Sequence, residues 1–113
     1  MSTFRVVEAL ASAARTTTGA ADLAALPGPY RELTVYIDVT AVSGTTPSMT
    51  VTYQISPDGV NFYDHTPGAA ITATGKQSIR IPTNIGAFGR LSYAITGTTP
   101  SFTFSAAVEL KRP

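Results

Sequence analysis

The stretch Ser43-Gly44-Thr45-Thr46-Pro47-Ser48-Met49-Thr50 returns with few changes as Thr96-Gly97-Thr98-Thr99-Pro100-Ser101-Phe102-Thr103. Glycine adopts positive φ without steric cost, proline donates no backbone hydrogen bond, and threonine hydroxyls bond to nearby backbone groups. In both copies a branched apolar residue precedes the motif and an alternating apolar run follows it. The sequence therefore predicts that each copy is the turn of a β-hairpin.

The segments around these motifs alternate between apolar and polar residues, as half-buried β-strands do. The alternation that starts at Leu33 slips between Val39 and Val42, which predicts a β-bulge near Ala41. Ser56-Pro57-Asp58-Gly59 is typical of a type I turn that places Gly59 in the left-handed region. We expect strands over residues 4–17, 31–42, 49–55, 60–65, 70–74, 77–81, 91–95 and 102–110.

Eight strands separated by regular turn signals predict an all-β protein, either an antiparallel two-sheet β-sandwich of jelly-roll or immunoglobulin-like type or a small barrel. Two segments leave alternatives open. Phe4 to Ala14 fits a strand or a helical turn, with the strand favoured. Ala20 to Pro29 fits a loop in which Asp22 caps one helical turn over residues 22–25.

The chain has 113 residues, of which 43% are hydrophobic and 13% charged, with a net charge of +1 and no cysteine. This length predicts a single domain, 1–113. Because the chain has no cysteine, we expect the domain to be stabilised without disulfides. No apolar run fits a secretory signal or a membrane span, so we expect a soluble protein that is not exported. The basic residues are scattered, which argues against a nucleic-acid partner. The low charge favours a surface that is covered by assembly.

Few side chains could support catalysis. His65 is the sole histidine and lies beside Asp64 at the end of an expected strand. Asp58, Asn61 and Asp64 offer fewer oxygens than Ca²⁺ requires, and Asp58 is itself a turn former. We therefore expect no enzyme activity, no metal site and no cofactor.

The aromatic residues are better candidates for binding. Phe62 and Tyr63 are neighbours on one strand, so alternation places them on opposite faces and at least one in the core. Tyr36 shares the polar face of its strand with Asp38. The pattern predicts an exposed Tyr36 ring that contacts a ligand such as a sugar, or another subunit.

Several of these segments together resemble small virion structural proteins of tailed bacteriophages. The resemblance is carried by Leu33 to Pro47, Ser56 to Phe62, Ile71 to Gly75 and Gly97 to Phe104. Such proteins are β-sandwiches that serve as head decoration (cement) proteins or minor tail components. The resemblance covers about Leu33 to Val108 and includes little of the N-terminal third.

The resemblance implies a protein on the capsid surface of the virion, assembled in the bacterial host cytoplasm, that binds the major capsid protein and stabilises the lattice. A tail component or adhesin that binds host-surface carbohydrate is the alternative. A homotrimer is expected, with no membrane partner. Residues 1–18 form either a first strand that pairs within its own domain or an arm that reaches a neighbouring subunit. The candidate interaction residues are Phe4, Arg5, Arg15, Tyr36, Asp38 and Tyr63.

Overall fold

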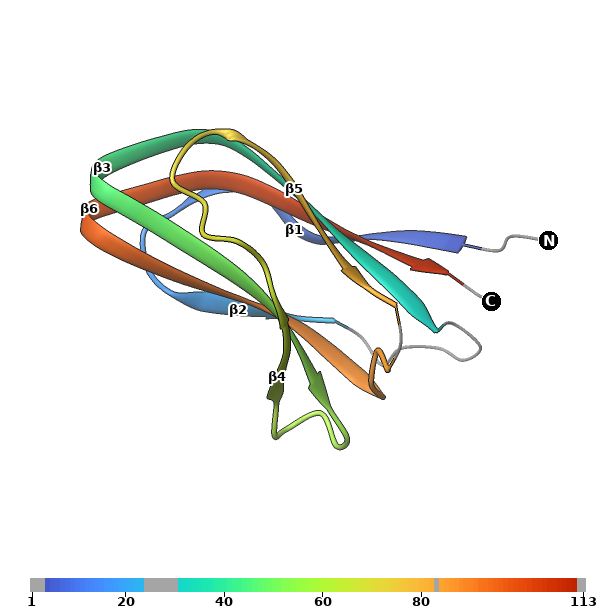
Figure 1. Ribbon diagram of the computed structural model, residues 1–113. Helices are drawn as coiled ribbons and strands as arrows, with labels where there is room; N and C mark the ends of the chain where they lie inside the picture. The colour runs from blue at the N-terminus through green and yellow to red at the C-terminus, as the bar shows by residue number, and fades with distance from the viewer. Residues whose placement is uncertain (1–3, 24–30, 83, 112–113) are drawn as a thin grey trace.

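The computed structural model describes residues 4–23, 31–82 and 84–111, and all regular structure in them is β-strand (Figure 1). This confirms the all-β, antiparallel class. No helix among these residues has the length and apolar character needed to span a bilayer. The strands are β1 (Phe4–Arg15), β2 (Gly19–Asp22), β3 (Glu32–Ser56), β4 (Tyr63–Pro67), β5 (Gly75–Ile81) and β6 (Phe88–Lys111).

All six strands belong to one sheet, in which β3 and β6 are the central pair. β3 has 25 residues and β6 has 24, and the two pair from Glu32↔Lys111 to Ser56↔Phe88. β1 and β5 flank one half of this pair, and β2 and β4 flank the other. We call these the β1 half and the β2 half. The expectation of eight strands in two separate sheets is not confirmed.

The two repeated motifs explain the difference in strand number, because neither is a hairpin turn. Each strand runs on through its motif, and the motifs pair with one another: Ser43↔Ser101, Thr45↔Thr98 and Ser48↔Thr96. Both strands bend sharply there, so the sheet folds over on itself (Figure 1). We call residues 43–48 and 96–101 the corner. Turn chemistry predicted the change of direction but not that the ladder would persist across it.

The geometry of the corner depends on its glycines. Gly44 has φ of 110° and Gly97 has φ of 126°, in the region that other residues rarely adopt. A Cβ on Gly44 would lie 2.7 Å from the carbonyl oxygen of Thr99, and one on Gly97 would lie 2.9 Å from that of Thr46. Each motif therefore accepts the backbone of the other in the space where a side chain would be.

The fold encloses one core between its two halves. Along β3 and β6 of the β1 half, and at the end of β5, buried residues alternate with exposed or half-buried ones, as predicted for β3. Tyr53 is fully buried, and its hydroxyl donates a hydrogen bond to the carbonyl oxygen of Ile85. Burial raises the pKa of Tyr53 above its ordinary value. The largest fully buried side chains also include Phe102, Phe104, Leu33, Ile37, Met49, Ile81 and Leu91.

Other local predictions had mixed outcomes. The register shifts between Val39 and Ala41, which confirms the bulge, and Gly59 has φ of 79°, which confirms the turn. The strand expected over 70–74 is reduced to a single bridge between Ile71 and Met49, because this segment crosses from β4 to β5. The strand expected from residue 60 begins only at Tyr63.

The N-terminal region contains one strand that was expected, β1, and one that was not, β2. Residues 4–15 form β1, which favours the strand reading over the helical turn. Asp22 is not a helix cap but the last residue of β2, which pairs with β6 at Arg90. A strand partner therefore outweighed the local preference for a turn. The rest of the expected loop, 24–29, lies outside the described residues.

The corner can be tested by adding a methyl group. Gly97→Ala forces a side chain into positive φ and against the backbone around Thr46 and Pro47. We expect a loss of about 1–3 kcal/mol in the free energy of unfolding, measured by urea denaturation. Gly44→Ala should cost a similar amount, because the two positions are equivalent.

The matched control is Thr98→Ala, an exposed residue at the same corner. Its effect should stay within about 0.5 kcal/mol. Equal stability of Gly97→Ala and the parent protein would contradict the role assigned to the corner.

Candidate interaction surface

The β1 half carries one polar face that points away from the core, which we call the outer face. Because side chains alternate along a strand, the residues between the buried ones share this face. Directly opposed residues of neighbouring strands lie side by side on it, such as Tyr36 between Ser78 and Ala107. The outer face includes Thr34, Tyr36 and Asp38 of β3, Lys76, Ser78 and Arg80 of β5, and Ser105, Ala107 and Glu109 of β6.

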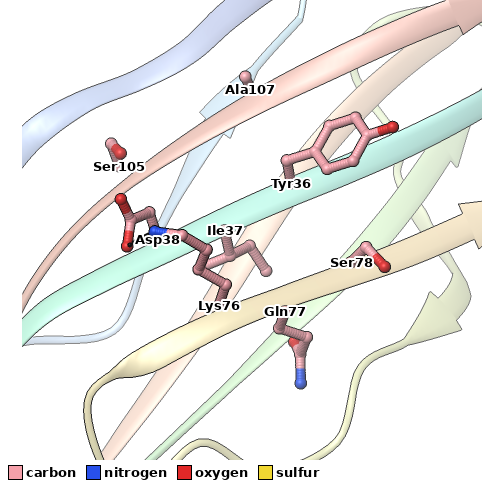
Figure 2. A pocket seen from close by; sticks show the side chains of 8 residues that line it. All are labelled: Tyr36, Ile37, Asp38, Lys76, Gln77, Ser78, Ser105 and Ala107. Atoms are coloured by element: carbon pink, nitrogen blue, oxygen red, sulfur yellow. Dashed lines mark ion pairs between the residues drawn. The ribbon is translucent and has the colours of Figure 1, made fainter.

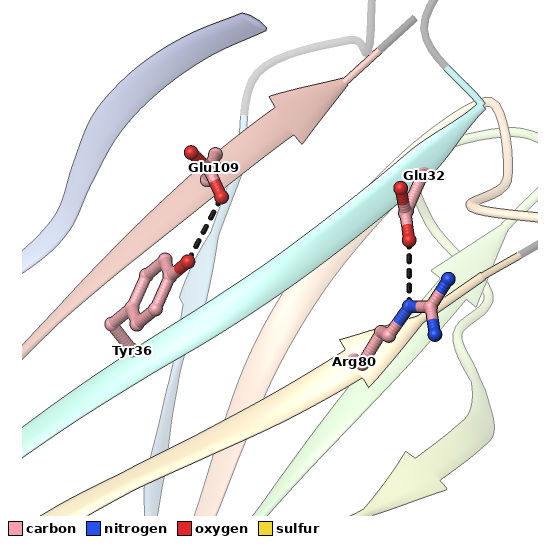
Figure 3. Close-up of polar contacts among 4 residues, drawn as sticks. All are labelled: Glu32, Tyr36, Arg80 and Glu109. Atoms are coloured by element: carbon pink, nitrogen blue, oxygen red, sulfur yellow. Dashed lines mark hydrogen bonds and ion pairs between the residues drawn. The ribbon is translucent and has the colours of Figure 1, made fainter. Parts of the chain in front are cut away.

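Tyr36 is the one large aromatic side chain among these residues, and it is 46% exposed. Its strand neighbours Ser78 and Ala107 are too small to cover the ring. The Tyr36 hydroxyl donates a hydrogen bond of 2.9 Å to Oε1 of Glu109 (Figure 3). The ring is thus held in place while remaining open to a partner.

Two ion pairs lie beside the ring. Nζ of Lys76 is 3.2 Å from Oδ1 of Asp38, and Nε of Arg80 is 2.6 Å from Oε2 of Glu32 (Figures 2 and 3). Exposed pairs of this kind contribute about 0–1 kcal/mol to stability. Their main effect is to place charges of both signs around Tyr36.

A shallow hollow of about 420 Å³ lies along the ring (Figure 2). On the outer face its side chains are an aromatic ring, a carboxylate with its ammonium partner, and hydroxyl groups. Such a surface can bind a flat polar partner or stack on a sugar ring. The hollow is lined by Tyr36, Ile37, Asp38, Lys76, Gln77, Ser78, Ser105 and Ala107.

The hydrogen bond to Glu109 also changes the acidity of Tyr36. The pKa of the Tyr36 phenol is raised, first because the neutral hydroxyl donates to the Glu109 carboxylate, then by desolvation and by the negative charge of Glu109. The phenol therefore stays neutral and keeps donating to Glu109 at physiological pH.

The six candidate residues named from the sequence do not gather at one place. Tyr36 and Asp38 share the outer face, whereas Tyr63 is 60% exposed at the start of β4 in the β2 half. Phe4 and Arg5 lie in β1 opposite Lys111 and Leu110, and their side chains are outside the described ones.

Arg15, the remaining candidate, makes its contacts within the chain. Its guanidinium donates to the carbonyl oxygens of Ala11, Ala13 and Phe104, at 2.8, 3.1 and 2.8 Å. It also lies 4.6 Å from the ring centroid of Phe104. The register of β1 shifts between Leu10 and Ala13, and Arg15 donates to the carbonyl oxygens of Ala11 and Ala13 at this bulge.

The Asp58 carboxylate accepts its hydrogen bonds from residues of its own turn. Oδ1 of Asp58 accepts hydrogen bonds from the backbone of Val60 and Asn61 and from the Ser56 hydroxyl, while Oδ2 accepts from the Asn61 amide. These donors, led by the Asn61 backbone, hold the pKa of Asp58 well below its ordinary value. In the described segments no three acidic, histidine or cysteine side chains lie close enough together to hold a metal ion.

The other aromatic and histidine candidates take packing positions. His65 packs edge-on against Tyr53 at 6.1 Å between ring centroids, and its Nδ1 lies 2.6 Å from Oγ1 of Thr66. Phe62 is half-buried under the Arg90 guanidinium, 4.1 Å from its ring centroid. With Tyr63 exposed, the expectation that Phe62 or Tyr63 enters the core is wrong, because regular strand geometry begins only at Tyr63.

Sequence reasoning missed the residues that surround Tyr36. Glu109, Lys76 and Ser78 come from strands that are far from Tyr36 in the chain and adjacent to it in the sheet. Alternation could have assigned them to an outward face. It could not have aligned the three strands, because residues far apart in the chain are brought opposite one another only by the pairing of β3 with β5 and β6.

Comparisons with known proteins agree on the fold and not on sequence. No protein-family model matches the chain, and no curated protein matches it. The chain is similar to the PBSX exported protein XepA, with a TM-score of 0.69 at 11% identity over 96% of this chain. It spans 37% of XepA. At this low identity, the structural similarity shows a shared fold alone.

Two further structures have similar folds. One is a chain from infectious bursal disease virus, Gx strain, with a TM-score of 0.54 and 11% identity, covering 95% of this chain and 31% of the other. The second comes from Bacillus endospore appendages, described as a family of disulfide-linked pili. Its TM-score is 0.50 at 16% identity, covering 97% of this chain and 91% of the other.

The hydrogen bond of Tyr36 can be tested by titration. We expect Glu109→Gln to lower the pKa of Tyr36, because the variant removes the carboxylate that favours the neutral phenol. The measurement is an NMR titration of the Tyr36 ring signals into the alkaline range. An unchanged midpoint would show that the contact does not persist in solution.

The Asp58 turn predicts a pH dependence of stability. Since its pKa is lowered from an unfolded-state value near 3.8, its charged form stabilises the fold above that pH, and this contribution is lost as pH falls below it. In an NMR titration, the Asp58 carboxyl should protonate at lower pH in the folded protein than in urea. Asn61→Ala should raise the folded midpoint, because it removes the side-chain amide donor and leaves the two backbone donors and the Ser56 hydroxyl.

Proposed function

We propose that the chain is a non-enzymatic structural protein of a virus particle. In finer form, it is a capsid decoration protein that binds the major capsid protein of a tailed bacteriophage and stabilises the outer lattice. The observation that carries this proposal is the fold, which recurs over nearly the whole chain in an exported PBSX protein and in a virus structure. The sequence resemblance to phage virion proteins points the same way.

The outer face is the surface we assign to the capsid contact. Tyrosine and arginine are enriched among residues that dominate the binding energy of protein interfaces. The Tyr36 ring is already held by Glu109, so binding immobilises little that was free. The ion pairs that flank it form a polar rim of both signs. The proposal includes a homotrimer on the lattice.

A second candidate function is a tail component or adhesin-type domain that binds host-surface carbohydrate. The hollow beside the exposed Tyr36 ring favours it, since a ring face next to Asp38 and Lys76 suits a sugar with its hydroxyl groups. The two functions place the chain at different sites on the particle.

Cryo-electron microscopy of particles from the host that carries the gene tests the proposal. We expect density for the chain on the outer surface of the head. Density confined to the tail would contradict the decoration function and favour the second candidate. Absence from the particle altogether would contradict both.

Rebinding to particles that lack the chain tests the assigned face. Tyr36→Ala should weaken binding about tenfold or more, equivalent to about 1.4 kcal/mol. Tyr63→Ala is the matched control, because it removes an exposed tyrosine from the other half of the fold. Similar losses in both variants, or a loss only in Tyr63→Ala, would show that the outer face is not the contact.

A further inference from the structure

The β1 half has two edges, formed by β1 and β5. In the part of the chain that the structure describes, β1 pairs with β6 alone and β5 with β3 alone (Figure 1). Each edge strand therefore has a second side with no strand beside it. An unpaired edge offers backbone donors and acceptors to another strand.

Residues 4–8 of β1 run without a bulge, one of the devices that protect edge strands, and the bulges of this strand come only after Glu8. Farther along β1, the Arg15 guanidinium occupies the carbonyl oxygens of Ala11 and Ala13. Before the bulge, Val6 is 58% exposed and Val7 is 36% exposed. In the described residues, neither of the two ion pairs involves the adjacent Glu8. An open edge with exposed valines favours pairing with a strand.

Strand direction identifies a partner for this edge. The four strands of the β1 half run in the order β1, β6, β3, β5, and each neighbouring pair is antiparallel. β1 and β5 therefore run in opposite directions. The β5 edge of a second copy, placed beside β1, continues the same antiparallel sheet with its outer face on the same side.

Charge selects the register of this contact. Residues 4–8 of β1 and 76–80 of β5 are five-residue runs without a register shift. With Glu8 opposite Lys76 of the second copy, Val6 lies opposite Ser78 and Val7 opposite Gln77. The Lys76 side chain is 81% exposed, and its pair with Asp38 is weak enough to allow a second carboxylate.

We propose that the first part of β1 binds the β5 edge of a second copy of this chain, joining the β1 halves into one continuous sheet. If β1 paired with β1 and the outer faces of both copies lay on the same side, Glu8 would lie opposite Val6 or Phe4, and its charge would have no partner. The contact joins different surfaces of the two copies, so it builds a ring or an open chain of subunits. It does not depend on the proposed virion function.

Disulfide trapping tests this contact, because the natural chain has no cysteine. Opposed residues of antiparallel strands lie at a distance that a disulfide can span. We mix purified Val6→Cys and Ser78→Cys chains under mild oxidation and follow the mixed disulfide by intact mass. It should form several-fold faster than in a mixture of Val6→Cys with Thr98→Cys, an exposed position at the corner.

The charge pair gives a second readout. Adding Glu8→Lys to the Val6→Cys chain should slow the mixed disulfide, and adding Lys76→Glu to the Ser78→Cys chain should restore it when both reversals are present. A mixed disulfide no faster than the Thr98→Cys control would overturn the proposal. So would a predominant Val6→Cys homodimer, which would indicate that β1 pairs with β1.

Discussion

The fold depends on the reciprocal contact of two backbones at the corner. Gly44 lies against Thr99 and Pro100, and Gly97 lies against Thr46 and Pro47 in the same way. Without a Cβ at these glycines, the paired strands can approach and bend together. One ladder can therefore cover both sides of the core, and the protein needs no break between its two layers.

The bend determines which surfaces are available for binding. Both halves turn their apolar side chains toward the same core, so their polar sides face outward in opposite directions. On the β1 half this leaves Tyr36 exposed between small residues and charged pairs. Such a surface suits the docking of a structural protein, and the open edge of β1 suits growth of the sheet. The two features serve separate contacts.

The candidate site was predictable only in part. Tyr36 and Asp38 alternate with the branched residues of their own strand, which is a local signal that one segment displays. Glu109 is far away in the chain, and its hydrogen bond to Tyr36 exists because β3 and β6 align in one register. Arg15, a candidate interaction residue from the sequence, donates to the carbonyl oxygens of Ala11 and Ala13 at the β1 bulge. That role becomes visible only when the bulge is known.

The sequence by itself determined the all-β class, the inward face of β3, the bulge near Ala41 and the turn at Gly59, because each rests on alternation or on the φ preference of a few neighbouring residues. Only the tertiary structure decided that the repeated motifs pair with one another, that six strands form one folded sheet, and that Asp22 ends a strand. The physical reason is that a glycine and a proline permit several changes of direction. The partner strand across the ladder selects one of them.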